Sequence, residues 1–262
     1  MKKFAAVFTI VKNEKYFLPI WYRYYSRYFP KQDIYILDHQ SNDGSTINID
    51  CNVHVVKNDQ AFDAAWLRDT VINFQKRLLQ DYEYVVFAEA DEIIVTLENS
   101  SNDLYEHIIN MKKLGRNFDV ATGYEMMHDT VYEKPYDFNN PILDQRRNWY
   151  REAAYDKTLI SSVPIEWGIG FHDTQYRKQA DWVNGENLID PNDNLILIHL
   201  HKFDYPIYMK RKINMKSFNM ANPMFDNEGF QQRFTDLKDM RDFFYSSESR
   251  LEMIPSNFPV VI

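Results

Sequence analysis

Three acidic residues, Glu89, Asp91 and Glu92, follow the apolar run of residues 84–87 and precede another at 93–94. An ionised carboxylate is costly to bury without a partner, and flanking strands leave these side chains little freedom to reach solvent. Glu89 and Asp91 lie two positions apart, so on an extended backbone they project from the same side and could share one divalent cation. The alternative is a solvated acidic turn between two strands.

Asp38 ends the apolar run of residues 34–37 and opens a polar turn that contains Ser41, Asp43 and Gly44. A carboxylate at a strand end can accept hydrogen bonds from a ribose or from a base edge. The turn adds backbone N–H groups and short side chains beside it. The same residues also form an ordinary turn, so the segment alone leaves both interpretations open.

Residues 166–173 hold two candidates for a general base, Asp173 and Glu166. In an inverting transfer to a hydroxyl, a carboxylate takes the hydroxyl proton. Gly168 permits close approach of the backbone, and Trp167 offers a ring face for a sugar. The alternative is a plain loop with a packed tryptophan.

Composition limits the classes of function. The net charge of -8 argues against a general nucleic-acid binder, since phosphate backbones need basic surfaces. Cys51 is the single cysteine, so an internal disulfide and a cysteine-based zinc site are excluded, and a cytoplasmic protein is expected. No apolar run approaches the roughly 18 residues of a transmembrane segment.

Strand patterns alternate with helical spacing through the first half of the chain. We expect strands at residues 4–11, 34–37, 53–56, 84–87 and 118–123, and helices at residues 14–28, 61–79 and 104–114. This order predicts an α/β fold with a mostly parallel sheet flanked by helices. Such sheets bind ligands at the carboxyl ends of their strands, where Asp38 and the Glu89–Asp91 pair both fall.

The second half carries a weaker pattern. Residues 126–194 indicate long loops and short strands, and a further strand is expected at residues 195–198. Helices are expected at residues 205–220 and 227–245. We therefore predict a main domain over residues 1–204 and a helical C-terminal extension over residues 205–262, packed on the same domain.

Several of these segments together resemble one enzyme family. The string Asp38-x-x-Ser41-x-Asp43-Gly44-Ser45 resembles the nucleotide-binding turn of family-2-type glycosyltransferases with the GT-A fold. Residues 11–14 resemble their first-strand motif, and residues 89–92 resemble their Asp-x-Asp metal motif in its Asp-x-Asp-Glu form. Residues 157–160 and 167–172 resemble a later lysine segment and a Gly-x-His segment. The resemblance covers roughly residues 4–205.

The resemblance implies a GT-A-like domain and a glycosyltransferase. Such an enzyme moves a sugar from a nucleotide-sugar, with a UDP-sugar favoured, to a glycan or another hydroxyl acceptor. The reaction is expected to invert the anomeric centre, and the setting is glycan or polysaccharide synthesis. Its implied nucleotide-binding residues are Asn13, Glu14, Asp38, Ser41, Asp43, Gly44 and Glu89.

The resemblance also implies a divalent metal, Mn²⁺ or Mg²⁺, that neutralises the leaving diphosphate. Its implied ligands are Glu89, Asp91 and one histidine near the last core strand, either His201 or His199. Two departures from the family pattern stand out. Glu89 replaces the first aspartate of the metal motif. His39 follows Asp38 where many members carry a second aspartate, and this departure leaves the nucleobase of the donor open.

Two other classes of function compete with this interpretation. The same carboxylates could serve a metal-dependent phosphoryl or pyrophosphate hydrolase, or a non-catalytic nucleotide-binding scaffold. The basic run Lys210, Arg211 and Lys212 could meet an anion, although it also suits a solvated helix face. The aromatic segment at residues 21–29 could make peripheral contact with a membrane or pack against the sheet.

Overall fold

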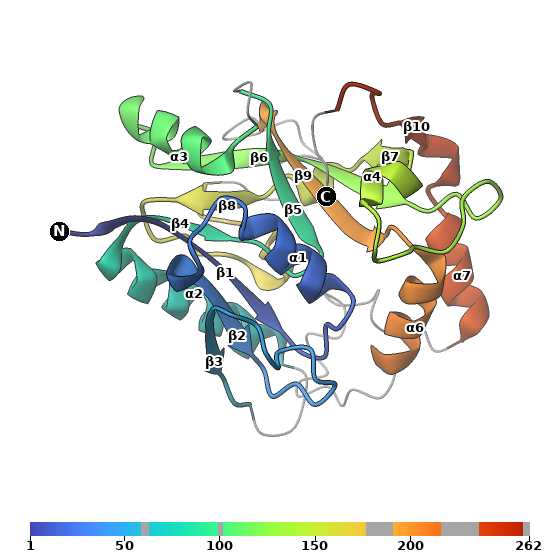
Figure 1. The fold of residues 1–262 in the computed structure, drawn as a ribbon, viewed down its shortest axis with the longest axis horizontal. Coiled ribbons are helices and arrows are strands. Elements are labelled where there is room, and N and C mark those ends of the chain that lie inside the picture. The colour runs from blue at the N-terminus through green and yellow to red at the C-terminus, as the bar shows by residue number, and fades with distance from the viewer. Residues whose placement is uncertain (59–62, 99–101, 177–190, 216–235, 259–262) are drawn as a thin grey trace.

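The computed structural model describes residues 1–58, 63–98, 102–176, 191–215 and 236–258. Its central feature is a mixed sheet with helices packed against it (Figure 1). Four neighbouring strands pair in parallel in the order β3-β2-β1-β4. They are β1 (Lys3–Val11), β2 (Ile34–Asp38), β3 (Asn52–Val55) and β4 (Tyr82–Phe87). The predicted α/β class is confirmed, and these four strands are those expected from the apolar runs.

The remaining strands extend the sheet with mixed pairing. Antiparallel pairs join β4 to β8, β8 to β6 and β6 to β7, while β6 and β9 run parallel and β9 pairs antiparallel with β5. A short strand, β10, pairs with β7. The bounds are β5 (Glu92–Thr96), β6 (Phe118–Met127), β7 (Asn148–Arg151), β8 (Thr158–Ser161), β9 (Asn192–Lys202) and β10 (Glu252–Met253). The result is a mixed sheet in which the four parallel strands continue into strands of mainly antiparallel pairing.

Alternate residues of β1 pack into two different cores. Ala5 and Val7 belong to the core under helix α1 (Phe17–Tyr25), whereas Ala6 and Phe8 belong to the core under α2 (Ala64–Asp81). Because strand side chains alternate between faces, the two helices cover opposite faces of the sheet. Both faces of β1 are therefore buried, as its continuous apolar sequence requires.

Helix α1 also fixes the strand that follows the acidic segment. The hydroxyl of Tyr24 donates to the carbonyl of Ile94 at 2.7 Å, and that of Tyr25 donates to the carbonyl of Glu92 at 3.2 Å. Both tyrosines are buried, where an unpaired hydroxyl would be costly. These bonds hold the start of β5, and with it the turn that carries Asp91.

The helix of residues 104–113 packs into the same core as α1, and two further helices follow β9. Asp63 caps α2 and Asp103 caps α3, each through backbone N–H groups of the first turn. Met127, Tyr150, Tyr208 and Phe244 form a small separate core beneath α6 and α7. The α-helices are α3 (Leu104–Lys113), α4 (Ile142–Gln145), α6 (Tyr205–Met215) and α7 (Leu237–Tyr245), and the 3₁₀ helices are η1 (Lys31–Asp33), η2 (Ala153–Tyr155), η3 (Ile169–Phe171) and η6 (Glu248–Arg250).

The predicted C-terminal helices correspond to α6 and α7 where the structure describes them. Residues 216–220 of the first and 227–235 of the second lie outside the described residues. The division into residues 1–204 and 205–262 stays a prediction. In the described part of the chain, no helix combines the length and the apolar character needed to cross a bilayer.

Candidate functional site

Asp91 lies in the turn between β4 and β5, at the carboxyl end of the parallel strands. Its Oδ2 accepts a hydrogen bond of 2.5 Å from Arg211 of α6 and lies 3.8 Å from Nε2 of His199. Asp91 is 5% exposed. Burial raises the pKa of its carboxyl, but Arg211 and His199 outweigh burial and hold that pKa well below its usual range. Asp91 is therefore an ionised carboxylate at neutral pH.

Glu14, which follows β1, shares the same arginine. Its Oε1 accepts a hydrogen bond of 2.8 Å from Arg211, so one guanidinium bridges two carboxylates. Burial raises the pKa of Glu14 to about 7, against the opposing effect of Arg211, while the charge of Asp91 raises it further. This corner of the site therefore carries more acidic than basic groups.

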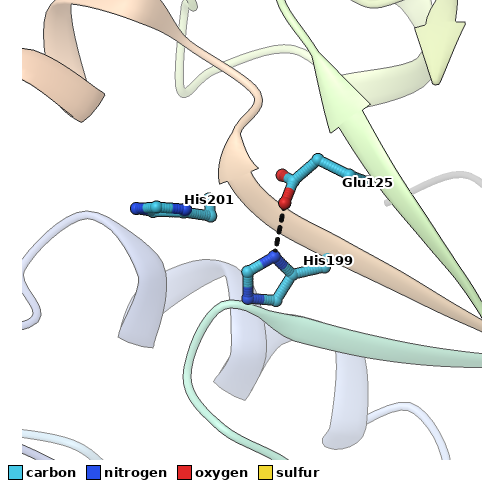
Figure 2. A group of neighbouring side chains, drawn as sticks. All are labelled: Glu125, His199 and His201. Atoms are coloured by element: carbon cyan, nitrogen blue, oxygen red, sulfur yellow. Dashed lines mark hydrogen bonds and ion pairs between the residues drawn. The ribbon is translucent and has the colours of Figure 1, made fainter. Parts of the chain in front are cut away.

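His199 and His201 lie on β9 beside Glu125 of β6, and all three are buried (Figure 2). Each offers one candidate ligand atom, and these atoms lie within 4.8 Å of one another. Glu125 pairs with His199 across the β6–β9 register, and its Oε2 lies 2.7 Å from Nδ1 of His199. A buried group of this composition could bind a metal ion.

The two histidines have different electrostatic surroundings. Burial lowers the pKa of His199, but Glu125 and Asp91 outweigh burial and raise it above its ordinary value. Burial, followed by the charges of Lys212 and Arg211, holds the pKa of His201 well below the ordinary value. The ring of His199 also stacks on Tyr155 at 4.1 Å between centroids, which fixes its plane.

Glu89 and Glu92 share a different cation, Lys157, which immediately precedes β8. Nζ of Lys157 donates to Glu89 at 2.8 Å and to Glu92 at 2.6 Å, and the backbone N–H of Glu89 donates to Glu92 at 2.9 Å. Lys157 and Glu92 are fully enclosed, whereas the Glu89 side chain is 33% exposed. The structure thus pairs Glu89 and Asp91 with separate cations, and Glu89 keeps an open side.

The predicted nucleoside turn is closed by its own hydrogen bonds. Asp38 accepts from the backbone N–H of Ser41 at 2.7 Å and from the hydroxyl of Thr46 at 2.8 Å. The backbone N–H of Asn13 donates to the Ser41 hydroxyl at 3.0 Å, which joins the end of β1 to this turn. Asn13 has a φ of 60° and Gly44 a φ of 80°, so both stand in the left-handed region.

Among the described residues, several buried polar atoms at or near this turn have no hydrogen-bond partner in the protein. They are Nε2 of His39, Oδ2 of Asp43, Oγ of Ser45 and the side-chain nitrogen of Asn58. Native proteins pair nearly all such atoms, so several orphans in one place fit a position that a polar ligand completes. Asp43 also raises the pKa of Glu14 through its charge, which places the turn close to the acidic corner.

In the segment predicted to supply the general base, the tryptophan is buried and Glu166 is exposed. Trp167 is 3% exposed, packs against Phe87, and donates its ring N–H to the carbonyl of Thr158 at 3.1 Å. The suggestion that its ring faces a sugar is therefore wrong, because the core of the protein covers it. Glu166 is 55% exposed at its side chain and pairs with Lys76 at 2.7 Å.

The loop from Gly168 to Asp173 is closed by a backbone bond of 2.8 Å between these two residues. Gly170 has a φ of 77°, which glycine adopts without strain, and a methyl group there would lie 3.1 Å from the ring of His172. The roles of Asp173 and Glu166 as bases stay predictions.

His172 is a polar residue of this loop with a fixed tautomer. Its Nδ1 lies 2.5 Å from the carbonyl of Ala154, and a carbonyl only accepts, so Nδ1 carries the proton. Burial, followed by the charge of Lys157, lowers the pKa of His172 to about 3. His172 is therefore a neutral ring whose Nε2 lone pair can accept a hydrogen bond. Its ring lies 6.0 Å from that of Tyr155, which stacks on His199.

A second cluster, Glu98, His107 and Asp119, meets the same geometric test for a metal site. His107 lies 2.9 Å from Glu98 and 3.2 Å from Asp119, one carboxylate at each ring nitrogen. Arg116 and Asn192 contact both carboxylates as well. Because the cluster contains its own positive and polar partners, it forms a closed structural network.

Sequence reasoning placed neither Glu125 nor Arg211 in the site. The apolar pattern predicts that the strand before Glu125 ends at residue 123. The basic run that contains Arg211 is typical of a solvated helix face. Lys157, which holds Glu89 and Glu92, is indicated in the sequence only by the resemblance of its segment to the glycosyltransferase family.

Comparisons with known proteins add little. No family model matches the chain, and no curated protein matches it. Among solved structures, the crystal structure of mannose-1-phosphate geranyltransferase from Thermus thermophilus is similar over 82% of this chain, with 10% identity and a TM-score of 0.32. The chain spans 62% of the length of that protein. A likeness this distant identifies neither a family nor an activity.

Proposed function

We propose that this protein is a metal-dependent glycosyltransferase that moves a sugar from a nucleotide-sugar to a hydroxyl acceptor. One observation carries the proposal. A chain of contacts joins the Asp38 turn to Asp91 through Asn13, Glu14 and Arg211, all along the carboxyl edge of the parallel strands. This edge is where such sheets bind nucleotides. A polar turn for the nucleoside lies next to an acidic and histidine-rich corner for its metal and diphosphate.

Asp91 and His199 are the proposed metal ligands, with Glu89 at the open side. Ligands of one metal at about 2.1 Å lie about 3–4 Å apart, and the 3.8 Å between Asp91 Oδ2 and His199 Nε2 fits that spacing. Glu125 holds the opposite nitrogen of His199, as the carboxylate partner of a metal-bound histidine commonly does. These contacts favour His199 over His201 as the ligand.

A bound Mn²⁺ or Mg²⁺ supplies a Lewis acid that neutralises the leaving diphosphate. The imidazole among the proposed ligands favours Mn²⁺ over Mg²⁺, which prefers oxygen. The chain's own residues position the groups around it. Lys157 holds Glu89 and Glu92 in fixed places, and the Asp38 turn orients the nucleoside, with a UDP-sugar as the favoured donor.

The base is proposed to be Asp173, with Glu166 as the competitor. The exposed ion pair between Glu166 and Lys76 supports this order, because it turns Glu166 toward solvent and a surface lysine. Loss of a general base lowers turnover by roughly 10²–10⁴-fold and leaves donor binding intact. Asp173→Asn should show this loss, and Glu166→Gln should retain most activity. Near-normal transfer by Asp173→Asn at saturating donor would exclude Asp173.

Nucleotide binding tests the proposal without knowledge of the acceptor. Thermal unfolding is measured with UDP, GDP, CDP and dTDP, each with and without Mn²⁺. A ligand at 100 times its dissociation constant stabilises the folded state by roughly 2.7 kcal/mol. We expect one nucleotide to stabilise the protein, and to do so strongly only with the metal. Stabilisation by none of the four would contradict the proposal.

Turnover distinguishes the transferase from its rivals. A glycosyltransferase releases nucleoside diphosphate only from nucleotide-sugars. Release of phosphate from many diphosphates would indicate a hydrolase, and binding without any release would indicate a scaffold.

A further inference from the structure

Arg211 stands at the point where the acidic residues of the site converge. Its side chain is 23% exposed, contacts Asp91 and Glu14 through two different nitrogens, and lies over the ring of Phe17 at 4.8 Å. It projects from α6, which follows the site strand β9 directly (Figure 1). A single side chain from the C-terminal part thus holds two residues of the N-terminal part.

Arg211 uses the same oxygen that faces the proposed metal ligand. Oδ2 of Asp91 accepts from Arg211 at 2.5 Å and lies 3.8 Å from Nε2 of His199. A metal held between Asp91 and His199 would bring a double positive charge beside the guanidinium. A metal ion and a guanidinium on the same carboxylate oxygen repel each other. Metal binding therefore weakens the contact between Arg211 and Asp91.

The surroundings of Arg211 restrict where its charge can go. Lys212 is 3% exposed and Lys202 is 2% exposed, so α6 and the end of β9 already contain buried basic side chains. Burial, followed by the charge of Arg211, lowers the pKa of Lys212 to about 7, so Lys212 is only partly charged at neutral pH. Glu14 stays in contact with Arg211, and a diphosphate on the metal would be its additional anionic partner.

We propose that Arg211 is a diphosphate-binding residue that occupies the cation position on Asp91 until metal and nucleoside diphosphate arrive together. This inference rests on the proposed function and names the residue that couples its two ligands. A guanidinium suits the task because it forms paired hydrogen bonds with carboxylates and phosphates alike. Metal alone must compete with Arg211, whereas metal with a diphosphate provides Arg211 with a new partner.

The inference predicts opposite effects on two binding constants. Without nucleotide, Arg211→Gln should bind Mn²⁺ about tenfold or more tightly than the wild type, because the competing cation is gone. With Mn²⁺ present, the same variant should bind nucleoside diphosphate about tenfold or more weakly, because charge-assisted hydrogen bonds are lost. The cooperativity between metal and nucleotide, which is reciprocal, should fall accordingly.

Isothermal titration calorimetry measures both constants for wild type, Arg211→Gln and Arg211→Lys. The titrants are Mn²⁺ alone, and UDP, GDP, CDP and dTDP in the presence of Mn²⁺. Lys210→Gln is the matched control. Lys210 is exposed and precedes Arg211 in the sequence, and its substitution removes the same charge. The control should bind like the wild type.

The outcomes separate this inference from the proposed function. If the wild type binds a nucleotide with Mn²⁺ and Arg211→Gln shows wild-type values for both constants, this inference is wrong and the proposed function stands. If the wild type binds no nucleotide with Mn²⁺, both fail. If Arg211→Gln does not fold, Arg211→Lys tests the inference, because lysine retains the charge but not the paired hydrogen bonds. Arg211→Lys should bind the diphosphate severalfold more weakly than the wild type. Binding equal to that of the wild type would overturn the inference.

Discussion

Replacing Lys157 by methionine should destabilise the protein strongly, although no ligand contact is removed. Lys157 is enclosed between Glu89 and Glu92, and burial alone would lower its pKa. The two carboxylates outweigh burial and raise that pKa, so the stabilisation is fully present below the unfolded value of 10.5 as long as the carboxylates stay ionised. Methionine fills a similar volume and leaves both carboxylates without their cation.

The size of the effect follows from the burial of the pair. Removing one partner of a buried ion pair costs about 3–5 kcal/mol, because an uncompensated charge remains. The entropy of unfolding is about 2.1 cal/mol/K per residue, or about 0.55 kcal/mol/K for 262 residues. The melting temperature of Lys157→Met should therefore fall by about 5–9 °C at pH 7.

Denaturant and thermal unfolding of Lys157→Met, with Lys76→Met as the control, measure this cost. Lys76 also pairs with a glutamate at 2.7 Å, but its side chain is 42% exposed and that of its partner 55% exposed. Exposed pairs contribute about 0–1 kcal/mol, so the control should unfold nearly as the wild type does.

The pH dependence tests the physical cause. In the variant, the unpaired carboxyls should take up protons more readily in the folded state than in the unfolded state. Its deficit relative to the wild type should therefore shrink as the pH falls from 7 toward 5. A deficit no larger than that of Lys76→Met, or one of constant size over this range, would refute the reasoning.

Three further predictions concern positioning residues. His172 has a pKa lowered to about 3, so between pH 3 and 6.5 the unfolded chain binds a proton that the folded ring does not. The stability of the wild type relative to His172→Asn should therefore fall by about 1.4 kcal/mol for each unit that the pH falls. Urea titrations from pH 4 to 6 measure this difference. Gly123→Ala places a methyl group against the backbone of Tyr155, so it should cost about 1–3 kcal/mol and weaken Mn²⁺ binding in calorimetry through the ring stacked on His199. His107→Asn should lower stability by about 1–3 kcal/mol and leave Mn²⁺ affinity unchanged, because its cluster is structural.

The elements that position the site could be predicted because their signals are local. Apolar runs ending in polar residues marked β1, β2 and β4, and each of the three lies where its run predicted. Parallel order followed from the alternation with helices, so the carboxyl-edge placement of Asp38 and Asp91 could be inferred from the sequence.

The partners of these residues could not be predicted, because they are set by tertiary register. Glu125 reaches His199 only because β6 runs on to Met127 and pairs in parallel with β9. Arg211 lies 120 residues from Asp91 and 197 from Glu14, and no local pattern reports such contacts. Trp167 was misinterpreted for the same reason, since its burial depends on packing against β4 and not on its neighbours in the chain.

The central claim is that Asp91 and His199 hold a divalent metal beside a nucleotide at the carboxyl edge of the sheet. A crystal structure with Mn²⁺ and the tightest-binding nucleoside diphosphate, using the anomalous signal of manganese, tests it most directly. We expect the metal at about 2.0–2.3 Å from Oδ2 of Asp91 and from Nε2 of His199, in contact with the diphosphate, and the nucleoside at the Asp38 turn. A metal bound elsewhere, or a nucleotide remote from Asp38 and Asp91, would contradict it.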